Sequence, residues 1–369
     1  TDLIADINGW FLADGGLGFR NSFYNARYGG SGGGVYLQAA SFAGSGKVSA
    51  NGRCGEQTYY AGGGGRIAVH YDPAAQTMAG LPSITFSANA PSCSTTVKSS
   101  AEIGTLWFTD ARFISDTVDG STGNILAGVV HVGSKANLSL SSLTVSNVRF
   151  GLSDDLASSL TLAGEVVVRG RLSELTFGVD NRLPAHEMTF RSSSAPPDLS
   201  FGSFAASNGA VVHVYASATN DLVSKEARVA FGDKLMIGAG GTVNVWCHPT
   251  NGATVKLSGT AAEIASGGTL QSVQAGYIGY GNKGYGPGPG SGTYGAGHGG
   301  MGPRGDGMSY ANMQYDSLEY PCMPGSAGGT GRVDQEGSAG GGVVHLTLAG
   351  DLVNNGTIRA DAKVESLSD

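Results

Sequence analysis

One phrase occurs twice, once near each end of the sequence, and it limits the possible folds more than any other feature. The first copy holds Gly32-Gly33-Gly34-Val35-Tyr36-Leu37 and then Gly46-Lys47-Val48-Ser49-Ala50-Asn51. The second holds Gly340-Gly341-Gly342-Val343-Val344-His345-Leu346 and then Gly356-Thr357-Ile358-Arg359-Ala360-Asp361. Internal repetition is typical of folds in which each unit buries its apolar face by stacking on the next. We therefore expect stacked β-units, with the second copy of one molecule leading into the first copy of another.

The composition excludes several classes of protein. Glycine supplies 62 of the 369 residues and charged residues only 14%, where a typical chain has about 7% glycine and about 25% charged residues. A disordered chain would be charged and poor in apolar residues. The net charge of −7 argues against nucleic acid or an anionic membrane as partner. The sequence has no apolar run long enough to span a bilayer.

Glycine content divides the chain into three zones, residues 1–80, 81–274 and 275–369. The middle zone alternates Leu, Val or Phe with Ser, Thr or Asn, which predicts strands with one buried face. Predicted strands include 137–140, 143–145, 160–162, 166–168, 175–177, 211–214, 229–231 and 243–246. We predict no helix at 154–159, where Ser153 is a candidate N-cap, because little more than one turn precedes the next strand. The predicted fold is all-β, a β-solenoid with little or no helix.

The length of one coil can be read from a repeated turn. Residues 236–243, Met-Ile-Gly-Ala-Gly-Gly-Thr-Val, are echoed by residues 263–270, Glu-Ile-Ala-Ser-Gly-Gly-Thr-Leu, at a spacing of 27. This spacing suits one coil of a solenoid. The outermost coils of such a stack present unpaired strand edges, which favour pairing with another chain.

From residue 276 to residue 342 the chain is glycine-rich, and fixing such a tract in one conformation costs conformational entropy. Tyrosines and prolines supply the few large side chains. We expect contacts from a neighbouring subunit to hold the tract. The alternative is a long loop folded against its own solenoid.

The four cysteines, Cys54, Cys93, Cys247 and Cys322, form no CxxC pair, which argues against a zinc ribbon or a thioredoxin-like site. An even number of cysteines suits an oxidising, extracellular setting with one or two disulfides. Buried free thiols are the alternative, and the sequence leaves the pairing open.

Polar residues offer few metal sites. His131, His213 and His345 each lie in an apolar strand phrase and could form a metal-binding or pH-sensing ladder if stacked, or could simply face solvent. Asp6 with Asn8, and Asp116 with Asp119, place oxygen ligands beside glycine, but neither pair completes an EF-hand loop. No cofactor is expected, and calcium is the one cation that the pattern leaves open.

Enzyme and glycan-binding functions have weak support. Carboxylates of a β-helical polysaccharide lyase or hydrolase could come from Asp154-Asp155 or from the group Asp110, Arg112, Asp116 and Asp119. A formal GxSxG at residues 29–33 lies in a glycine run without the strand–turn–helix setting of a nucleophile elbow. The aromatic residues that could stack on sugars, but that also suit a core or a cap, are Trp10, Phe11, Trp107, Phe108 and Trp246.

Together with residues 62–71, Gly-Gly-Gly-Gly-Arg-Ile-Ala-Val-His-Tyr, the repeated phrase resembles the glycine-rich repeats of very large secreted surface proteins of planctomycete and verrucomicrobium type. It is also similar to autotransporter-like β-helix passengers. The resemblance implies an extracellular, structural or adhesive role and carries no catalytic residue over.

We expect a secreted structural subunit that assembles head to tail into a filament or surface fibre by β-strand addition. The residues expected at the joint are Val35, Tyr36 and Leu37 at the head and Leu346, Leu348, Ile358 and Ala360 at the tail. The alternatives are an adhesin segment that binds glycans and a β-helical polysaccharide lyase or hydrolase.

Overall fold

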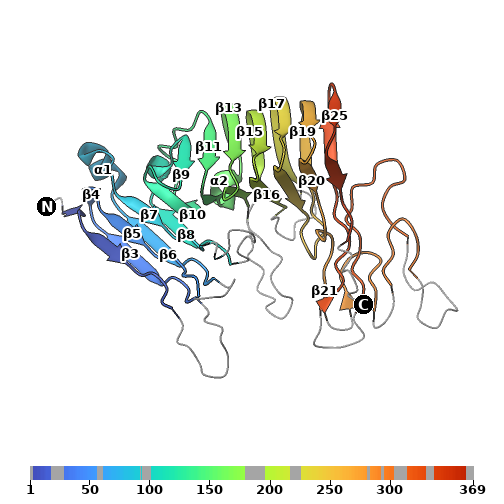
Figure 1. Cartoon of the computed structure of the whole chain (residues 1–369), viewed down its shortest axis with the longest axis horizontal. Helices are drawn as coiled ribbons and strands as arrows, with labels where there is room; N and C mark the ends of the chain where they lie inside the picture. Colours follow the sequence, from blue (N-terminus) through green and yellow to red (C-terminus); the bar gives the residue numbers. More distant parts are fainter. Residues whose placement is uncertain are drawn as a thin grey trace. The chain divides into compact units, whose positions relative to one another are not determined.

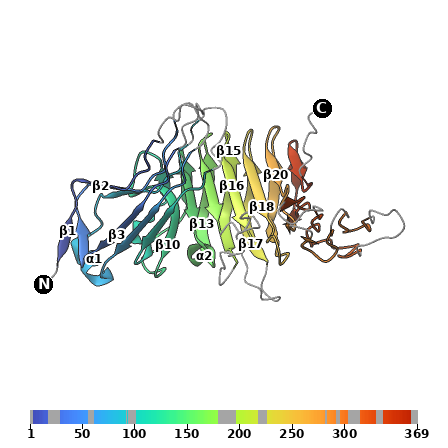
Figure 2. The same cartoon turned by 90° about the horizontal axis from the view of Figure 1, so that it is seen from below.

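The computed structural model describes residues 3–17, 29–55, 61–91, 93, 101–178, 196–216, 226–280, 283–291, 295–302, 314–329 and 336–362. Its elements are nearly all β-strands stacked in parallel, which confirms the predicted all-β, solenoid-like class (Figures 1 and 2). The chain forms two compact units, one of Thr1–Leu156 with Gly164–Leu175 and one of Ala157–Ala163 with Thr176–Asp369. The division falls inside the 81–274 zone.

The first unit contains twelve complete strands among its described residues: β1 (Ile4–Asp6), β2 (Trp10–Leu12), β3 (Gly34–Gln38), β4 (Ser41–Ala43), β5 (Lys47–Ser49), β6 (Arg66–His70), β7 (Thr85–Ser87), β8 (Thr105–Phe108), β9 (Thr117–Asp119), β10 (Ile125–Val132), β11 (Leu143–Ser146) and β12 (Arg149–Leu152). Strands β13 (Leu160–Arg169) and β14 (Glu174–Phe177) contribute residues to both units. The helical elements are α1 (Pro73–Ala79), the 3-10 turn η1 (Ala111–Phe113) and α2 (Asp154–Ala157). Parallel ladders join β2, β5, β7 and β10, and likewise β3, β6, β8 and β10.

The second unit contains β15 (Asp198–Ser207), β16 (Val211–Tyr215), β17 (Ala227–Ile237), β18 (Thr242–Trp246), β19 (Val255–Ile264), β20 (Thr269–Gln271), β21 (Gly279–Tyr280), β22 (Lys283–Gly284), β23 (Glu336–Gly337), β24 (His345–Leu348), β25 (Leu352–Asn354) and β26 (Thr357–Arg359). One parallel ladder joins β15, β17 and β19, with β24 and β25 both on β19; another joins β16, β18, β20 and β26. Strands β21, β22 and β23 form a small antiparallel sheet.

The predicted coil length is confirmed in the second unit. Met236 lies opposite Glu263, and Val243 lies opposite Leu270. Both offsets equal 27 residues (263 − 236 and 270 − 243), so each repeated turn stacks on its predecessor. Most predicted strands of the middle zone are present, but residues 137–140 form no strand, and Asn137 has a left-handed φ of 62°.

Inward-facing side chains repeat from coil to coil and form the core of each unit. In the first unit Ile67, Leu106 and Val130 follow one another in register and are at most 1% exposed. In the second unit Val212, Val243 and Leu270 do the same and are all 0% exposed. Because every rung repeats the same apolar position, an added rung needs only another aliphatic or aromatic side chain.

Glycine has a specific role where the first three coils of the first unit close, at Ala13, Ala50 and Ala88. The N–H groups of Gly33, Gly65 and Gly104 donate to the carbonyls of Ala13, Ala50 and Ala88 of the preceding coil, each at 2.7 Å. A Cβ on Gly32 or Gly64 would overlap the carbonyl oxygen of Ala50 or Ala88 respectively, so the close approach requires glycine. In the second unit a Cβ on Gly341 would meet the Ala360 carbonyl in the same way. This contact explains why the repeated phrase begins with glycines.

Two helices depart from the expected pattern of strands. The Asp72 side chain accepts hydrogen bonds from the N–H groups of Ala74 and Ala75 and Pro73 opens the helix, so α1 has a capped start that sequence analysis missed. The absence of a helix at 154–159 was also a wrong prediction, since α2 forms there. Ser153 does not cap it with its side chain: the Ser153 hydroxyl is buried and has no hydrogen-bond partner in the described structure.

The described part of the glycine tract is held by hydrogen bonds within this chain. Gly276 donates to Gly340 and Gly325 donates to Gly341, while Tyr277 donates to Gly325 and is buried. Two further main-chain bonds, from Ile278 to Pro249 and from Gly342 to Ser272, join the tract to the strand-rich middle zone, as in the alternative of a tract folded on its own solenoid. Tyr294 and Tyr310 lie outside the described residues.

Candidate functional site at the open strand edges

Strands β1, β2 and β3 of the first unit each have a strand partner on one side only within the described chain, as do β4 and β9. Strand β1 pairs with β4, β2 with β5, and β3 with β6. Figure 2 shows β1, β2 and β3 in blue at the N-terminal part of the first unit. Unpaired edges present main-chain donors and acceptors that another strand can use.

The direction of the open main-chain groups follows from the hydrogen bonds beside them. The N–H of Ala39 donates to His70 of β6, whereas that of Ala40 donates to Leu3 of the other neighbouring coil. Successive residues of a strand point their N–H groups to opposite sides, so the N–H groups of Tyr36 and Gln38 face the open side of β3.

The same argument applies to β2. The N–H of Ala13 donates to Ser49 of the β5 coil. Because alternate residues of a strand share a side, the N–H of Phe11 also faces β5. The N–H groups of Trp10 and Leu12 therefore face the open side.

Apolar side chains gather on these edges. Trp10 is 77% exposed, Phe11 47% and Leu12 55%, and on β1 Ile4 is 58% exposed. Val35 and Leu37 of β3 are half-buried, although the residues opposite them, Ile67 and Val69, are at most 1% exposed. Burying this surface against another chain would release water from apolar contact.

The second unit has open edges on β24, β25 and β26. The N–H of Thr357 donates to Gly268, and the carbonyl of Arg359 accepts from Ser272. Residues 357 and 359 therefore use their main chain toward β20, which leaves the groups of Ile358 facing the open side. The carbonyl of Asp361 accepts from Gln274, so the N–H of Ala360 also faces the open side.

Strand β24 follows the same rule. The N–H of Ala349 donates to Gly259, so the main-chain groups of Leu346 and Leu348 point away from β19. Their side chains are half-buried, as is that of Ile358, whereas Leu257 and Leu270 one coil further in are at most 1% exposed.

All seven residues expected at a joint lie on open edges, in two groups. Val35, Tyr36 and Leu37 are on β3 of the first unit. Leu346 and Leu348 are on β24 of the second unit, Ile358 is on β26, and Ala360 follows it. Sequence analysis missed the part that β2 contributes, although the run Trp10-Phe11-Leu12 after Asn8-Gly9 is a strand signal.

The histidines do not form a ladder. His131, His213 and His345 lie opposite Trp107, Asn244 and Lys256. Carboxylates that the sequence spacing did not reveal approach two of them: His131 Nδ1 lies 3.8 Å from Asp155, and His345 Nδ1 lies 3.7 Å from Glu226. Burial lowers the pKa of His131, with Asp155 acting in the opposite direction.

The calcium candidates hydrogen-bond to protein groups. Asn8 donates to Asp6 at 2.8 Å, and Ser141 donates to both oxygens of Asp116. Hydrogen bonds from Ser121 and Ser146 lower the pKa of Asp119 to about 2. Across the described ranges, no three His, Cys, Asp or Glu side chains are grouped as a metal site.

The acidic residues considered for catalysis lie in different elements and are not grouped at one site among the described residues. Asp110 is buried and binds the Arg112 guanidinium at 2.7 Å, the Tyr71 hydroxyl at 2.7 Å and the Asn137 amide at 2.9 Å. Asp154 and Asp155 lie on α2 and not on a strand. In the GxSxG segment, the two glycines that flank Ser31 donate main-chain hydrogen bonds to other glycines, Gly30 to Gly16 and Gly32 to Gly63.

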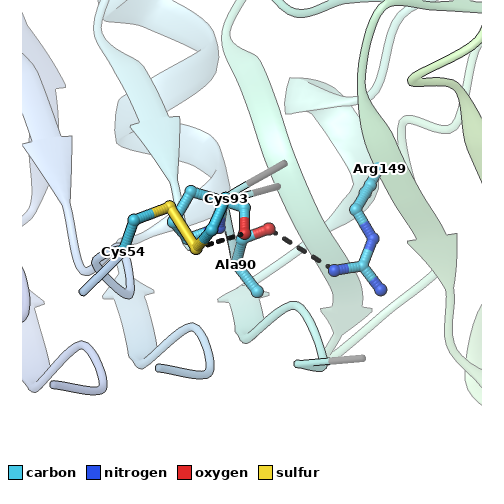
Figure 3. The surroundings of a disulfide bond; sticks show 5 residues. Cys54, Ala90, Cys93 and Arg149 are labelled. Atoms are coloured by element: carbon cyan, nitrogen blue, oxygen red, sulfur yellow. Dashed lines mark hydrogen bonds between the residues drawn. A yellow bond between two sulfur atoms is a disulfide. The ribbon is translucent and has the colours of Figure 1, made fainter. Parts of the chain in front are cut away.

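Cys54 and Cys93 form a disulfide with a Cα–Cα distance of 5.3 Å (Figure 3). Close by, Arg149 donates to the carbonyls of Ala90 and Ala101 and binds Glu174. Cys247 is a buried free thiol, and burial raises its pKa to about 11, whereas Cys322 is free and exposed.

Comparisons with protein-family models, curated proteins and solved structures give no match to this chain. Among the described residues, no helix is both long and apolar enough to cross a bilayer.

Proposed function

We propose that this chain is an extracellular structural subunit that associates end to end, with β26 of one molecule pairing to β2 of the next. The open donors and acceptors of the two strands are complementary. Trp10 and Leu12 offer N–H groups on β2, while the carbonyl of Ile358 and the N–H of Ala360 are open beside β26. Main-chain bonds of this kind give affinity without a preformed pocket.

A contact inside the first unit supplies the template. Strand β5 pairs with β7, and Val48 lies opposite Phe86. The β5 segment Gly46-Lys47-Val48-Ser49-Ala50 resembles the β26 segment Gly356-Thr357-Ile358-Arg359-Ala360. The N–H of Ala50 donates to Ser87, and that of Thr85 donates to Gly46. Placed in the same register, Ile358 lies opposite Phe11, and Ala360 donates to Leu12.

Side-chain burial supports the same register. Phe11 is 47% exposed and lies opposite the fully buried Val48. Ile358 is half-buried and lies opposite the fully buried Leu270. Both side chains thus continue an apolar ladder whose next rung is missing from the described chain. A contact between unlike ends that does not close into a ring extends without limit, so this association produces a fibre.

The test removes one main-chain donor at a time. Proline is tolerated on an edge strand where the N–H faces outward, so Leu12→Pro removes a bond that only the partner uses, and Leu12→Val is its matched control. We expect wild type and Leu12→Val to form particles whose mass grows with concentration in sedimentation velocity, and Leu12→Pro to stay monomeric. Ala360→Pro against Ala360→Ser repeats the test on the other edge. Equal association of the proline variants and their controls contradicts the proposal.

The extracellular setting rests on the Cys54–Cys93 disulfide, since such bonds persist under oxidising conditions. Glycan binding is a second candidate, favoured by an outward-facing groove of about 420 Å3 on the first unit that Tyr36, Arg66 and Trp107 line. Aromatic rings beside a cation suit an acidic sugar. Retention on immobilised uronate polymers by wild type but not by Trp107→Ala would support it.

A further inference from the structure

Among the described residues, the first coil of the first unit has two strands where the second coil has three. Coil two consists of β3, β4 and β5, and above it β1 lies on β4 and β2 lies on β5. No described strand lies on the open side of β3. This position, above Gly34–Gln38, is called the β3 slot below.

The slot is closed at both ends. At one end Ala40 donates to Leu3, and at the other Gly33 donates to Ala13. The first coil is therefore hydrogen-bonded to the second just before and just after β3, but no described strand pairs with β3 itself on this side. At about 3.3 Å per residue, the slot has room for one strand of about five residues.

We propose that the β3 slot binds an extended polypeptide strand that begins with glycine and continues aliphatic–aromatic–aliphatic. The main chain of Tyr36 and Gln38 supplies the hydrogen bonds. The slot takes no part in the contact between β26 and β2, so this inference does not rest on the proposed function.

The aliphatic positions follow from the inward ladders below the slot. Val35 stands above Ile67 and Leu106, and Leu37 stands above Val69 and Phe108. Every rung below is fully buried, whereas Val35 and Leu37 are half-buried. A strand in the slot completes their burial only if two alternate side chains are apolar.

The aromatic position follows from the outward face. The Tyr36 ring lies 4.9 Å from that of His70, which stacks at 4.2 Å on Trp107. Tyr36 remains 63% exposed and ends this row. An aromatic side chain between the two aliphatic ones extends the row by one ring.

The leading glycine follows from the way the coils close. In coils two and three, Gly32 and Gly64 lie against the carbonyls of Ala50 and Ala88 of their own coil, where a Cβ would overlap. Ala13 holds the equivalent place in the first coil, since its carbonyl accepts from Gly33 as that of Ala50 accepts from Gly65. A strand that enters the slot past Ala13 therefore needs glycine there.

The sequence of residues 32–40 itself has the required pattern and provides the probe. A fluorescein-labelled peptide Gly-Gly-Gly-Val-Tyr-Leu-Gln-Ala-Ala is titrated with the full chain, and fluorescence anisotropy reports binding. We expect saturable binding. Two control peptides, one with serine for valine and leucine and one with valine for all three glycines, are expected to bind about tenfold or more weakly, because each loses buried contacts or clashes.

The site is identified by variants of the protein. Tyr36→Pro removes both the ring and an N–H that faces the slot, while Tyr36→Val removes the ring alone and is expected to bind the peptide about tenfold more tightly than Tyr36→Pro. Gln38→Pro against Gln38→Thr is the second pair, used if Tyr36→Pro lowers the melting temperature. Leu12→Pro is expected to bind the peptide normally while failing to associate end to end. Absence of saturable binding by wild type, or equal binding by a folded proline variant and its control, overturns the inference.

Discussion

The side-chain amide of Gln76 makes the two main-chain hydrogen bonds to Phe42 that a neighbouring strand would otherwise make. The N–H of Phe42 donates to Gln76 Oε1 at 2.8 Å, and Gln76 Nε2 donates back to the Phe42 carbonyl at 2.9 Å. Strand β4 pairs with β1 on one side, and helix α1 lies on the other. One buried amide thus provides the donor and the acceptor that a parallel strand would have provided, and it lets a helix take the place of a strand in that coil.

Replacing this amide should cost much of the stability of the first unit. Gln76 is 0% exposed, so Gln76→Met leaves two buried main-chain groups of Phe42 without partners and is expected to lower the free energy of unfolding by about 3 kcal/mol. Urea denaturation followed by circular dichroism measures the change. Met78, 80% exposed on the same helix, gives the control Met78→Gln, for which a change within about 0.5 kcal/mol is expected. Equal stability of the two variants would show that the Gln76 bonds contribute little.

Asp110 should make the first unit sensitive to acid. Its carboxyl is buried, which favours the neutral form, but hydrogen bonds from Arg112, Tyr71 and Asn137 outweigh burial and lower its pKa from 3.8 to about 2. A carboxyl with a lowered pKa stabilises the fold above its unfolded pKa, and this contribution is lost as the pH falls from about 4 to about 2.

The shift corresponds to about 2 kcal/mol. Urea denaturation of wild type and Asp110→Asn should therefore show a stability difference at pH 6 that shrinks by about this amount near pH 2. Asp155→Asn, at an exposed carboxyl on α2, is a suitable comparison. A difference between wild type and Asp110→Asn that stays constant across this range contradicts the role given to the Asp110 carboxylate.

Much of this architecture was predictable because a solenoid repeats a local pattern. The alternation of Leu143, Thr144 and Val145 and the 27-residue echo of the 236–243 turn give strand, face and coil length without any long-range information. The repeated glycines were recognisable as a signature. The physical reason for these glycines could not be predicted, because the Ala50 carbonyl that excludes a Cβ at Gly32 is 18 residues away in sequence (50 − 32).

Two kinds of feature could not be predicted from the sequence. One is the use of a helix where neighbouring coils use a strand, and the other is the pairing of segments that are distant in the sequence. The Asp72-Pro73 start of α1 is a helix signal, but only the structure shows Gln76 bonding to β4. Nothing in the spacing of the cysteines selects Cys54 and Cys93, since the pairing depends on the fold bringing two residues 39 apart in sequence to a Cα–Cα distance of 5.3 Å. The open edges were expected in general, but the exposure of Trp10 and Phe11 depends on what lies above β2.

Reducing the disulfide should destabilise the first unit without abolishing its ladders. Cys54 and Cys93 are 39 residues apart, and a closed loop of this size is expected to contribute about 4 kcal/mol through the entropy of the unfolded chain. The paired variant Cys54→Ser with Cys93→Ser should therefore show a clear loss in urea denaturation, and wild type in reducing agent should match it. The control Cys322→Ser removes an exposed free thiol and is expected to change nothing. Loss of strand signal on reduction in the absence of urea would mean that the disulfide is required for folding.

Equivalent apolar residues in neighbouring coils should respond differently to truncation, and the difference should depend on concentration. Leu270 is 0% exposed between Val243 and Ile358, so Leu270→Ala is expected to cost about 3 kcal/mol at any concentration. Ile358, half-buried on the open edge, should cost only about 1 kcal/mol as Ile358→Ala in dilute protein. End-to-end pairing buries Ile358 against Phe11 and stabilises the folded state by mass action. The cost of Ile358→Ala should therefore rise as protein concentration is raised from nanomolar to micromolar, while that of Leu270→Ala stays constant. Denaturation midpoints of both variants that shift in parallel with concentration would show that Ile358 is not at the contact.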